Sequence, residues 1–459
     1  MLRVEAGFTP RYCDGQSRRS FLQVGLAGMA SVGLPQILRA KEQSRQAGTS
    51  AKDTACILIW LDGGPGHMDM YDMKPQAPAE YRGLWNPIPT NVSGMEITEL
   101  YPLQAKCADK FSIVRSLHHD NGDHFAAGHI MLTGRTGASG ADTPGKSPFV
   151  GAVASKLAGP RKPGMPAHAA VPYASSIGLR PGYFGANYLG VANNPFETDG
   201  DPNASNFQVQ NIAVPGGMTV ARLEDRTALA KQFDRLRRDV DSSGMIDSMD
   251  RFDRQAYDLV AGDNARKAFN IGSEDPRMRD RYGRHQWAQS MLLARRLVEA
   301  GSTVVTVHLG GWDHHWDLKA SYERLLPIVD QGVSALFEDL AQTGLLDTTL
   351  VMLCGEFSRT PRMNNGGNGG APMSMGTPGR DHWGNAMFCL MGGGGVKGGR
   401  IVGSTNRLGE APQDRPITAP DIHHTMFQVL GIDPNVNFLN HAGRPIAALE
   451  PGAVIQELL

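Results

Sequence analysis

Cys56-Ile57-Leu58-Ile59-Trp60-Leu61-Asp62-Gly63-Gly64 is the stretch that decides the fold, because six apolar residues run without a break into an acidic residue and two glycines. A continuous apolar run of this length predicts a strand that is buried on both faces. Residues 303–309 and 349–354 have the same character. These three runs predict the central strands of one buried sheet.

Helical patterns alternate with these strands. Residues 285–300 have helical periodicity and are followed by Gly301, a residue typical of helix C-termini. A second helix is predicted over about residues 322–342, directly before the run 349–354. This alternation predicts the α/β class, with a mainly parallel central sheet and helices on its faces.

The length of the chain is enough for one large α/β domain or two average ones, and we predict one. The chain has 459 residues, and its net charge of −1 gives no reason to expect nucleic acid as a partner. We expect the domain to span residues 51–459, with a Pro-, Gly- and Asn-rich loop excursion over about 160–215 and a charged helical insertion over about 219–300. Five cysteines without a Cys-x-x-Cys pattern predict buried thiols.

The N-terminal residues 1–50 have the pattern of a Tat-type signal peptide and linker. Arg18-Arg19 precedes a short, Gly-containing apolar run at residues 24–38. This run is too short to predict a stable membrane span. We therefore expect export to the periplasm or the extracellular space; the alternative is a disordered tail with a chance arginine pair.

Acidic and histidine residues cluster where the predicted strands end. Ligands in open α/β sheets bind outside the carboxyl ends of the strands, and carboxylates and imidazoles bind divalent metals such as Zn²⁺. The clusters therefore predict one metal-centred hydrolytic site. The alternatives are polar surface loops and, for the acidic residue after 349–354, a general base. The predicted metal ligands are Asp62, Asp69, Asp313, His315, Glu356, Asp381 and His382.

Arginines and further histidines complete the predicted site. Arg359 and Arg380 offer bidentate donors to a phosphate or sulfate oxyanion, although a surface ion pair with Glu356 is an equal alternative for Arg359. His124 and His129 lie in a histidine-rich stretch and are candidates for acid/base catalysis or metal binding. Each of them taken singly also fits an ordinary half-buried histidine.

Two nucleotide-binding patterns are rejected on their context. Residues 140–147 match the Walker A letters, but a polar turn rather than a strand precedes them. Residues 393–398 match Gly-x-Gly-x-x-Gly, but a strand rather than a helix is predicted to follow. Neither pattern therefore predicts a phosphate-binding loop.

The motifs together resemble the bacterial domain of unknown function 1501. The resemblance covers about residues 50 to 459, and the motifs are Gly63-Gly64-Pro65 with Asp69-x-x-Asp72, Gly311-Trp312-Asp313-x-His315, Gly355-Glu356-Phe357-Ser358-Arg359 and Gly379-Arg380-Asp381-His382-Trp383. That family is similar to the alkaline phosphatase and sulfatase superfamily. The resemblance implies a three-layer α/β/α sandwich.

The resemblance also implies one or two divalent ions (Zn, Ca or Mn) that hold a phosphate or sulfate ester. By position, Asp62 or Asp69 would be the first-strand ligand, and Asp313 with His315 would be the later Asp/His pair. Glu356 would replace an Asp of the superfamily, and His382 would be the late His ligand.

Two positions depart from the superfamily pattern. His124 stands where sulfatases have their nucleophilic Cys or Ser, and Phe357 stands where a metal-binding His is usual. His124 is then a ligand or an unusual nucleophile, or cleavage uses metal-activated water, or activity is lost.

We therefore expect an exported, metal-dependent hydrolase of sulfate or phosphate esters, with a small-molecule or glycan ester as substrate. The alternative is a non-catalytic envelope protein that binds sulfated or phosphorylated glycans, and a pure scaffold would bind no metal. The sequence identifies no protein partner.

Overall fold

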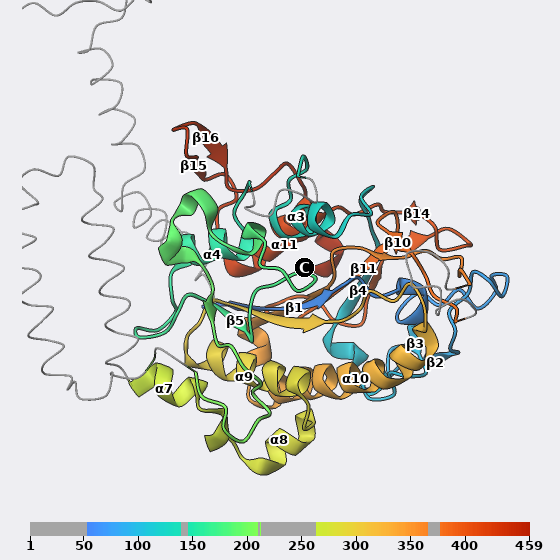
Figure 1. The fold of residues 1–459 in the computed structure, drawn as a ribbon, viewed down its shortest axis with the longest axis horizontal. Coiled ribbons are helices and arrows are strands. Elements are labelled where there is room, and N and C mark those ends of the chain that lie inside the picture. The colour runs from blue at the N-terminus through green and yellow to red at the C-terminus, as the bar shows by residue number, and fades with distance from the viewer. Residues whose placement is uncertain (1–52, 139–145, 210–211, 213–262, 366–376) are drawn as a thin grey trace, which may run out of the picture. The chain divides into compact units, whose positions relative to one another are not determined.

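Eight strands within the described residues form the central sheet in a computed structural model of the chain (Figure 1). Their order across the sheet is β12-β4-β11-β8-β1-β7-β5-β6. In chain order they are β1 (Ala55–Asp62), β4 (Ser112–Leu117), β5 (His168–Val171), β6 (Phe196–Glu197), β7 (Val304–Gly310), β8 (Thr349–Cys354), β11 (Met387–Gly392) and β12 (Ile401–Val402).

The structure describes residues 53–138, 146–209, 212, 263–365 and 377–459. Residues 53–459 form one compact unit. Three predicted features lie wholly or mainly outside the described residues. They are the leader and linker over 1–50, the Walker-like run 140–147 and the part of the helical insertion before residue 263.

The sheet is mainly parallel, as predicted. β1 pairs in parallel with β7 and β8, and Asp62 lies opposite Gly310 in this register. Only β11 runs against its neighbours β8 and β4 among the described sheet strands. Every residue of β1 is buried, which explains its uninterrupted apolar sequence.

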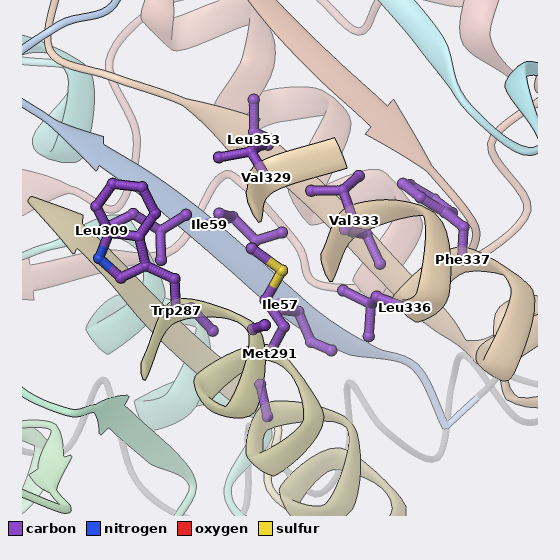
Figure 2. Close-up of a cluster of buried hydrophobic side chains, with 14 of the residues drawn as sticks. Ile57, Ile59, Trp287, Met291, Leu309, Val329, Val333, Leu336, Phe337 and Leu353 are labelled. Atoms are coloured by element: carbon purple, nitrogen blue, oxygen red, sulfur yellow. The ribbon is translucent and has the colours of Figure 1, made fainter. Parts of the chain in front are cut away.

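One face of the sheet is covered by α9 (Gln286–Ala300) and α10 (Leu318–Gln342), with α7 (Asp263–Phe269) and α8 (Pro276–Tyr282) packed outside them. Ile57 and Ile59 of β1 point toward Met291 of α9 and Val333 of α10 (Figure 2). Alternate residues of a strand share a face, so every second residue of β1 contributes to this core. The helix predicted to end at Gly301 is confirmed, and α10 begins at Leu318 rather than near residue 322.

The other face is covered by α3 (His124–Thr133), α4 (Val150–Ala158) and α11 (Ala419–Leu430). Cys56, Leu58 and Trp60 of β1 belong to the hydrophobic core on this side. The two cores lie on opposite faces of one sheet, so the three-layer α/β/α sandwich is confirmed (Figure 1).

Small two-stranded ribbons surround the sheet. In β9–β10 the register sets His382 opposite Arg359, which brings two distant segments of the chain together. The ribbons are β2 (Pro87–Pro89) with β3 (Glu96–Thr98), β9 (Ser358–Arg359) with β10 (His382–Trp383), β13 (Ser404–Thr405) with β14 (Pro412–Asp414), and β15 (Asn437–Leu439) with β16 (Pro445–Ala447).

The stretch 160–215, predicted as a loop excursion, contributes two strands to the sheet. β5 pairs in parallel with β7, and β6 extends the sheet beyond β5. β5 is only four residues long, and Pro- and Gly-rich segments surround it. Pairing with β7 rather than local sequence therefore determines that it is a strand.

Four cysteines, Cys56, Cys107, Cys354 and Cys389, are buried free thiols, as predicted. Among the residues that the structure describes, no helix is long and apolar enough to cross a membrane.

Candidate metal centre

Residues from distant parts of the chain meet where the parallel strands end. Asp313 and His315 follow β7, His382 lies on β10, and His124 is the first residue of α3. β1, β7 and β8 run in the same direction, so the loops that follow them emerge at one edge of the sheet. The structure thus brings together side chains that are separated by up to 258 positions, as the span from 124 to 382 shows.

The carboxylate of Asp313 is the centre of this cluster. Its Oδ1 lies 3.0 Å from His315 Nε2 and 3.1 Å from His382 Nε2, and these two nitrogens are 3.0 Å apart. Its Oδ2 lies 3.4 Å from His124 Nε2. Three imidazole nitrogens and a carboxylate therefore face one point.

The outer hydrogen bonds of two of these histidines fix where their protons lie. His315 Nδ1 donates to Asp381 Oδ1 at 2.8 Å, and His382 Nδ1 donates to the carbonyl oxygen of Gly122 at 2.6 Å. Both partners only accept hydrogen bonds, so each Nδ1 carries a proton. In the neutral rings both Nε2 atoms are then lone pairs, and they face each other at 3.0 Å.

His124 is held in the same way by a carboxylate behind it. Its Nδ1 donates to Glu356 Oε1 at 2.7 Å, which leaves the Nε2 lone pair directed toward Asp313. A carboxylate or carbonyl that holds the outer nitrogen of a histidine is the usual support of a metal-binding imidazole.

This donor set fits a divalent cation. Neutral imidazole lone pairs and a carboxylate at these distances repel one another unless positive charge lies among them. Zn²⁺ with ligands at 2.0–2.1 Å in tetrahedral geometry sets its ligand atoms about 3.3 Å apart. The triangle formed by Asp313, His315 and His382, with edges of 3.0, 3.0 and 3.1 Å, has nearly that size.

The pKa shifts of His124, His315 and Asp313 also indicate that this cluster favours positive charge. Burial lowers the pKa of His124, but hydrogen bonds to Asp313 and Glu356 outweigh burial and raise it to about 9. The hydrogen bond to Asp313 also raises the pKa of His315. Burial raises the pKa of Asp313, but hydrogen bonds from the three histidines hold it well below its ordinary value. Burial lowers the pKa of His382, so without a cation it is protons on His124 and His315 that supply the charge.

Glu356 lies behind His124 rather than in the triangle. Its side chain is fully buried, and its Oε1 accepts from His124 Nδ1 and from the backbone N–H of Gly63 at 2.9 Å. Burial raises its pKa. Glu356, predicted as a metal ligand, is therefore placed to orient His124.

Asp62, at the end of β1, belongs to a neighbouring polar cluster. Its Oδ2 accepts from the backbone N–H of Ile177 at 2.8 Å and lies 3.2 Å from His308 Nε2. Asp62 is close enough to Glu356 for its charge to raise the pKa of that carboxyl. Asp62 thus borders the cluster around Asp313 without contacting Asp313 itself.

Arg359 fixes the position of Asp313 by hydrogen bonding. Its guanidinium is buried and donates to Asp313 Oδ1 at 2.6 Å, and also to the carbonyl oxygens of Gly64 at 2.7 Å and of Gly63. These bonds tie the turn after β1 to the metal triangle. The donors that were predicted to bind an oxyanion are therefore used to position a ligand.

Phe357 forms an apolar wall beside the triangle. Its ring stacks on the His382 ring, with centroids 4.4 Å apart, and contacts the His124 ring at 4.8 Å. Gly64 is required beneath it, because a Cβ there would lie 2.4 Å from the Phe357 ring. The residue at the expected position of a metal-binding histidine thus restricts how the two neighbouring imidazoles lie.

Asp69 and Arg380 make a separate, fully buried ion pair. Arg380 Nε donates to Asp69 Oδ2 at 2.9 Å, and the backbone N–H of Leu84 donates to Asp69 Oδ1 at 3.0 Å. The guanidinium also donates to the carbonyl oxygens of Thr360 and Arg82, at 3.0 and 2.9 Å. Both side chains are engaged with each other and with backbone, so the proposed site does not use the predicted roles of Asp69 as a metal ligand and Arg380 as an oxyanion donor.

His129 lies inside α3 and is buried. Its Nδ1 lies 2.8 Å from the carbonyl oxygen of Arg135 and 3.4 Å from Thr133 Oγ1, and its ring packs edge-on against Tyr183. His129 lies in the middle of α3, and these contacts direct its Nδ1 toward the turn that follows the helix. Its predicted catalytic role stays a prediction, and the proposed site does not use it.

Residues 53–459 match the model of the family described as "Protein of unknown function (DUF1501)". The chain belongs to this family. The matched range includes all the residues of the metal triangle, so the DUF1501 resemblance drawn from the motifs is confirmed. No curated protein matches the sequence.

Several solved structures resemble this DUF1501 protein at low identity. They include the PsFucS1 sulfatase from Pseudoalteromonas sp. (11% identity, TM-score 0.37, covering 88% of this chain and 73% of that one) and the alkaline phosphatase from the Antarctic bacterium TAB5 (13% identity, TM-score 0.38, 82% and 98%). The lipoteichoic acid synthase LtaP from Listeria monocytogenes is also similar (12% identity, TM-score 0.33, 84% and 73%). At these values the likeness carries no argument about activity, which must come from the site.

His308 is a site residue that sequence reasoning missed. It lies on β7, and its Nε2 lies 3.3 Å from Ser175 Oγ as well as close to Asp62. The available signal was a titratable residue inside an otherwise apolar run, which in a buried strand requires a polar partner.

Proposed function

We propose that this DUF1501 protein is a metal-dependent hydrolase of sulfate or phosphate esters. One observation carries the proposal: the Nε2 atoms of His315 and His382 and the Oδ1 atom of Asp313 form a triangle of the size that one divalent ion requires. The outer nitrogens of both histidines are already held by acceptors, so the inner lone pairs are available to a metal.

In this proposal Asp313, His315 and His382 hold the ion, and Arg359 fixes the position of Asp313. A divalent ion in this position supplies Lewis-acid polarisation of an ester oxygen. His124 lies at a longer distance and on the other carboxylate oxygen of Asp313. We assign it the role of general base, because a divalent ion beside Asp313 would take over the positive charge that His124 otherwise carries, and would leave its Nε2 unprotonated to accept a proton from attacking water.

Glu356 supports this role of His124. It accepts the Nδ1 proton of His124, which keeps the basic nitrogen turned toward the site, and its negative charge stabilises the imidazolium that forms. Water is the attacking group in this scheme. The side chains that contact Asp313 among the described residues are three histidines and Arg359, with no serine, threonine or cysteine.

The lack of a hydroxyl or thiol nucleophile beside Asp313 among the described residues also favours the second candidate, a non-catalytic protein that binds phosphorylated or sulfated ligands. The two proposals differ in one respect. The hydrolase releases phosphate or sulfate from an ester, whereas the binding protein holds both metal and ligand without turnover.

The test combines elemental analysis with ester hydrolysis. The full chain, loaded in turn with Zn²⁺, Mn²⁺ and Ca²⁺, is assayed on 4-nitrophenyl phosphate, 4-nitrophenyl sulfate and a set of sugar phosphates and sulfates. Asp313→Asn should abolish both metal binding and release of the anion, while the exposed Asp347→Asn should change neither. Bound metal without turnover of any ester would support the binding protein instead.

Export through a twin-arginine leader is a further proposal, supported by Arg18-Arg19 and the apolar run that follows them. Fractionation of cells that express the full chain tests it. Arg18→Lys with Arg19→Lys should retain the protein in the cytoplasm.

A further inference from the structure

A hollow opens beside the cluster around Asp313. It has a volume of about 370 Å³, within the range of small-ligand sites, and Tyr81, Arg362, Asn364, Asp381, Trp383 and Glu410 line it. These residues come from four segments of the chain, and two of them lie on or next to β10, which Figure 1 shows near β14. The metal proposal does not use this hollow.

The β9–β10 ribbon borders both the hollow and the cluster around Asp313. Successive residues of a strand point to opposite faces, and His382 contacts Asp313 while Trp383 lines the hollow. Asp381 joins the two sites, because it lines the hollow and also accepts from His315 Nδ1 at 2.8 Å. A molecule bound in the hollow would therefore contact Asp381, whose carboxylate holds the proposed metal-binding residue His315.

The walls of the hollow are held rigidly by buried hydrogen bonds. Arg380, paired with Asp69, donates to the carbonyl oxygens of Thr360 and Pro361, which form part of the wall. Trp383 Nε1 donates to the carbonyl oxygen of Glu410 at 2.8 Å, which fixes the plane of the indole. The Asp69–Arg380 pair therefore supports a preformed site rather than the metal itself.

The lining is chemically specific. Asp381 and Glu410 supply hydrogen-bond acceptors, whereas Asn364 and Arg362 supply donors, and Trp383 supplies an aromatic face. Arg362 is exposed and makes no ion pair among the described residues. Two carboxylates against one guanidinium disfavour a free anion. Hydroxyl groups both donate and accept, so a polyhydroxylated ring satisfies both kinds of lining group.

We propose that this hollow is a subsite for the sugar ring of the substrate, with the ring packed on Trp383 and its hydroxyls bound by Glu410, Asp381 and Arg362. This proposal rests on the proposed function in one respect: the sugar ring belongs to an ester whose phosphate or sulfate group would lie at the proposed metal site. Under this assignment the substrates are sugar phosphates or sugar sulfates rather than aryl esters.

Kinetics on two esters with the same acid group test the assignment. Trp383→Ala should raise KM for a sugar ester about tenfold or more, and change KM for the 4-nitrophenyl ester less than about twofold, because the lost contact is aromatic packing on the ring. Trp383→Phe should restore most of the loss, since it keeps an aromatic face. Arg362→Ala should weaken the sugar ester alone, and Arg407→Ala, another exposed arginine outside the hollow, should change neither substrate.

Binding measured without turnover separates this inference from the hydrolase proposal. Saturation-transfer NMR with methyl glucoside, methyl galactoside and tetramethylammonium is recorded on the full chain and on Trp383→Ala and Glu410→Gln. Glycoside signals that disappear in both variants support the subsite even if no ester is hydrolysed. No glycoside signal with the wild-type protein, or binding of tetramethylammonium alone, overturns it.

Discussion

Two arginine–aspartate pairs, each with a buried arginine, lie near the carboxyl edge of the sheet, and they differ in whether their charge is balanced. In the Arg380–Asp69 pair both side chains are fully buried, and one positive charge meets one negative charge. In the Arg359–Asp313 pair the arginine is equally buried, but the aspartate is 35% exposed and faces three histidines.

The surroundings of the second pair carry an excess of negative charge. Glu356 and Asp381 hold the outer nitrogens of His124 and His315, so one arginine balances only one of three carboxylates. We call the fully buried, charge-balanced Arg380–Asp69 pair the closed pair, and the partly exposed Arg359–Asp313 pair the open pair. The closed pair stabilises the fold and has no acceptor left for a cation. The open pair has further acceptors around it, which a cation would neutralise. The comparison therefore indicates a structural role for the Arg380–Asp69 pair and a role in the proposed metal site for the Arg359–Asp313 pair.

The largest expected effect comes from opening the closed pair. Arg380→Met leaves Asp69 buried without its partner, and should lower the free energy of unfolding by about 3–5 kcal/mol. Urea denaturation of the metal-free protein measures it, with Arg407→Met as an exposed control. A loss below about 1 kcal/mol would contradict a structural role for the pair.

Asp313→Asn should act on the metal rather than on the fold. We expect Zn²⁺ affinity to fall at least about 100-fold, because the change removes a charged ligand and not merely a supporting group. Isothermal titration of Zn²⁺ into chelator-stripped protein measures the affinity. An equal fall in Zn²⁺ affinity in Arg380→Met, measured under conditions where that variant is fully folded, would contradict the different roles of the two pairs.

The open pair should make the metal-free protein sensitive to pH. The pKa of His124 in the folded protein is about 9, above its ordinary value of 6.5. Its contribution to stability is therefore complete below about pH 6.5 and is lost as pH rises through about 9, which amounts to roughly 3 kcal/mol. Urea midpoints at pH 6 and pH 9.5 should show this loss, and His124→Gln should remove it.

Glu356→Gln should give the smallest effect of the series. The amide still fits behind His124 but no longer carries the charge that fixes the tautomer and supports the imidazolium, so kcat should fall about tenfold. Metal content should remain near one equivalent. Complete loss of metal in this variant would show instead that Glu356 is itself a ligand.

The sequence predicted the architecture where local signals were strong. The unbroken apolar runs of β1 and β8 and the glycine after α9 were sufficient to place these elements. β5 and β6 were not found, because their short sequences become strands only by pairing beside β7. Tertiary pairing of this kind has no local signature.

The site was predicted as a group of segments but not residue by residue. Strand ends in a parallel sheet must converge, so Asp313, His315 and His382 could be expected to meet. The sequence did not distinguish Asp69 from Asp313, since both are acidic residues in glycine-containing loops that follow a predicted strand. The difference arises from the β9–β10 register, which sets His382 beside Asp313 and leaves Arg380 to face Asp69.

The most direct test is an anomalous diffraction experiment at the zinc edge on crystals of the Zn²⁺-loaded protein. We predict one strong peak within about 2.0–2.2 Å of Asp313 Oδ1 and of the Nε2 atoms of His315 and His382. Absence of a peak there, with His315 and His382 hydrogen-bonded directly to each other, would contradict the assignment of this cluster as a metal centre.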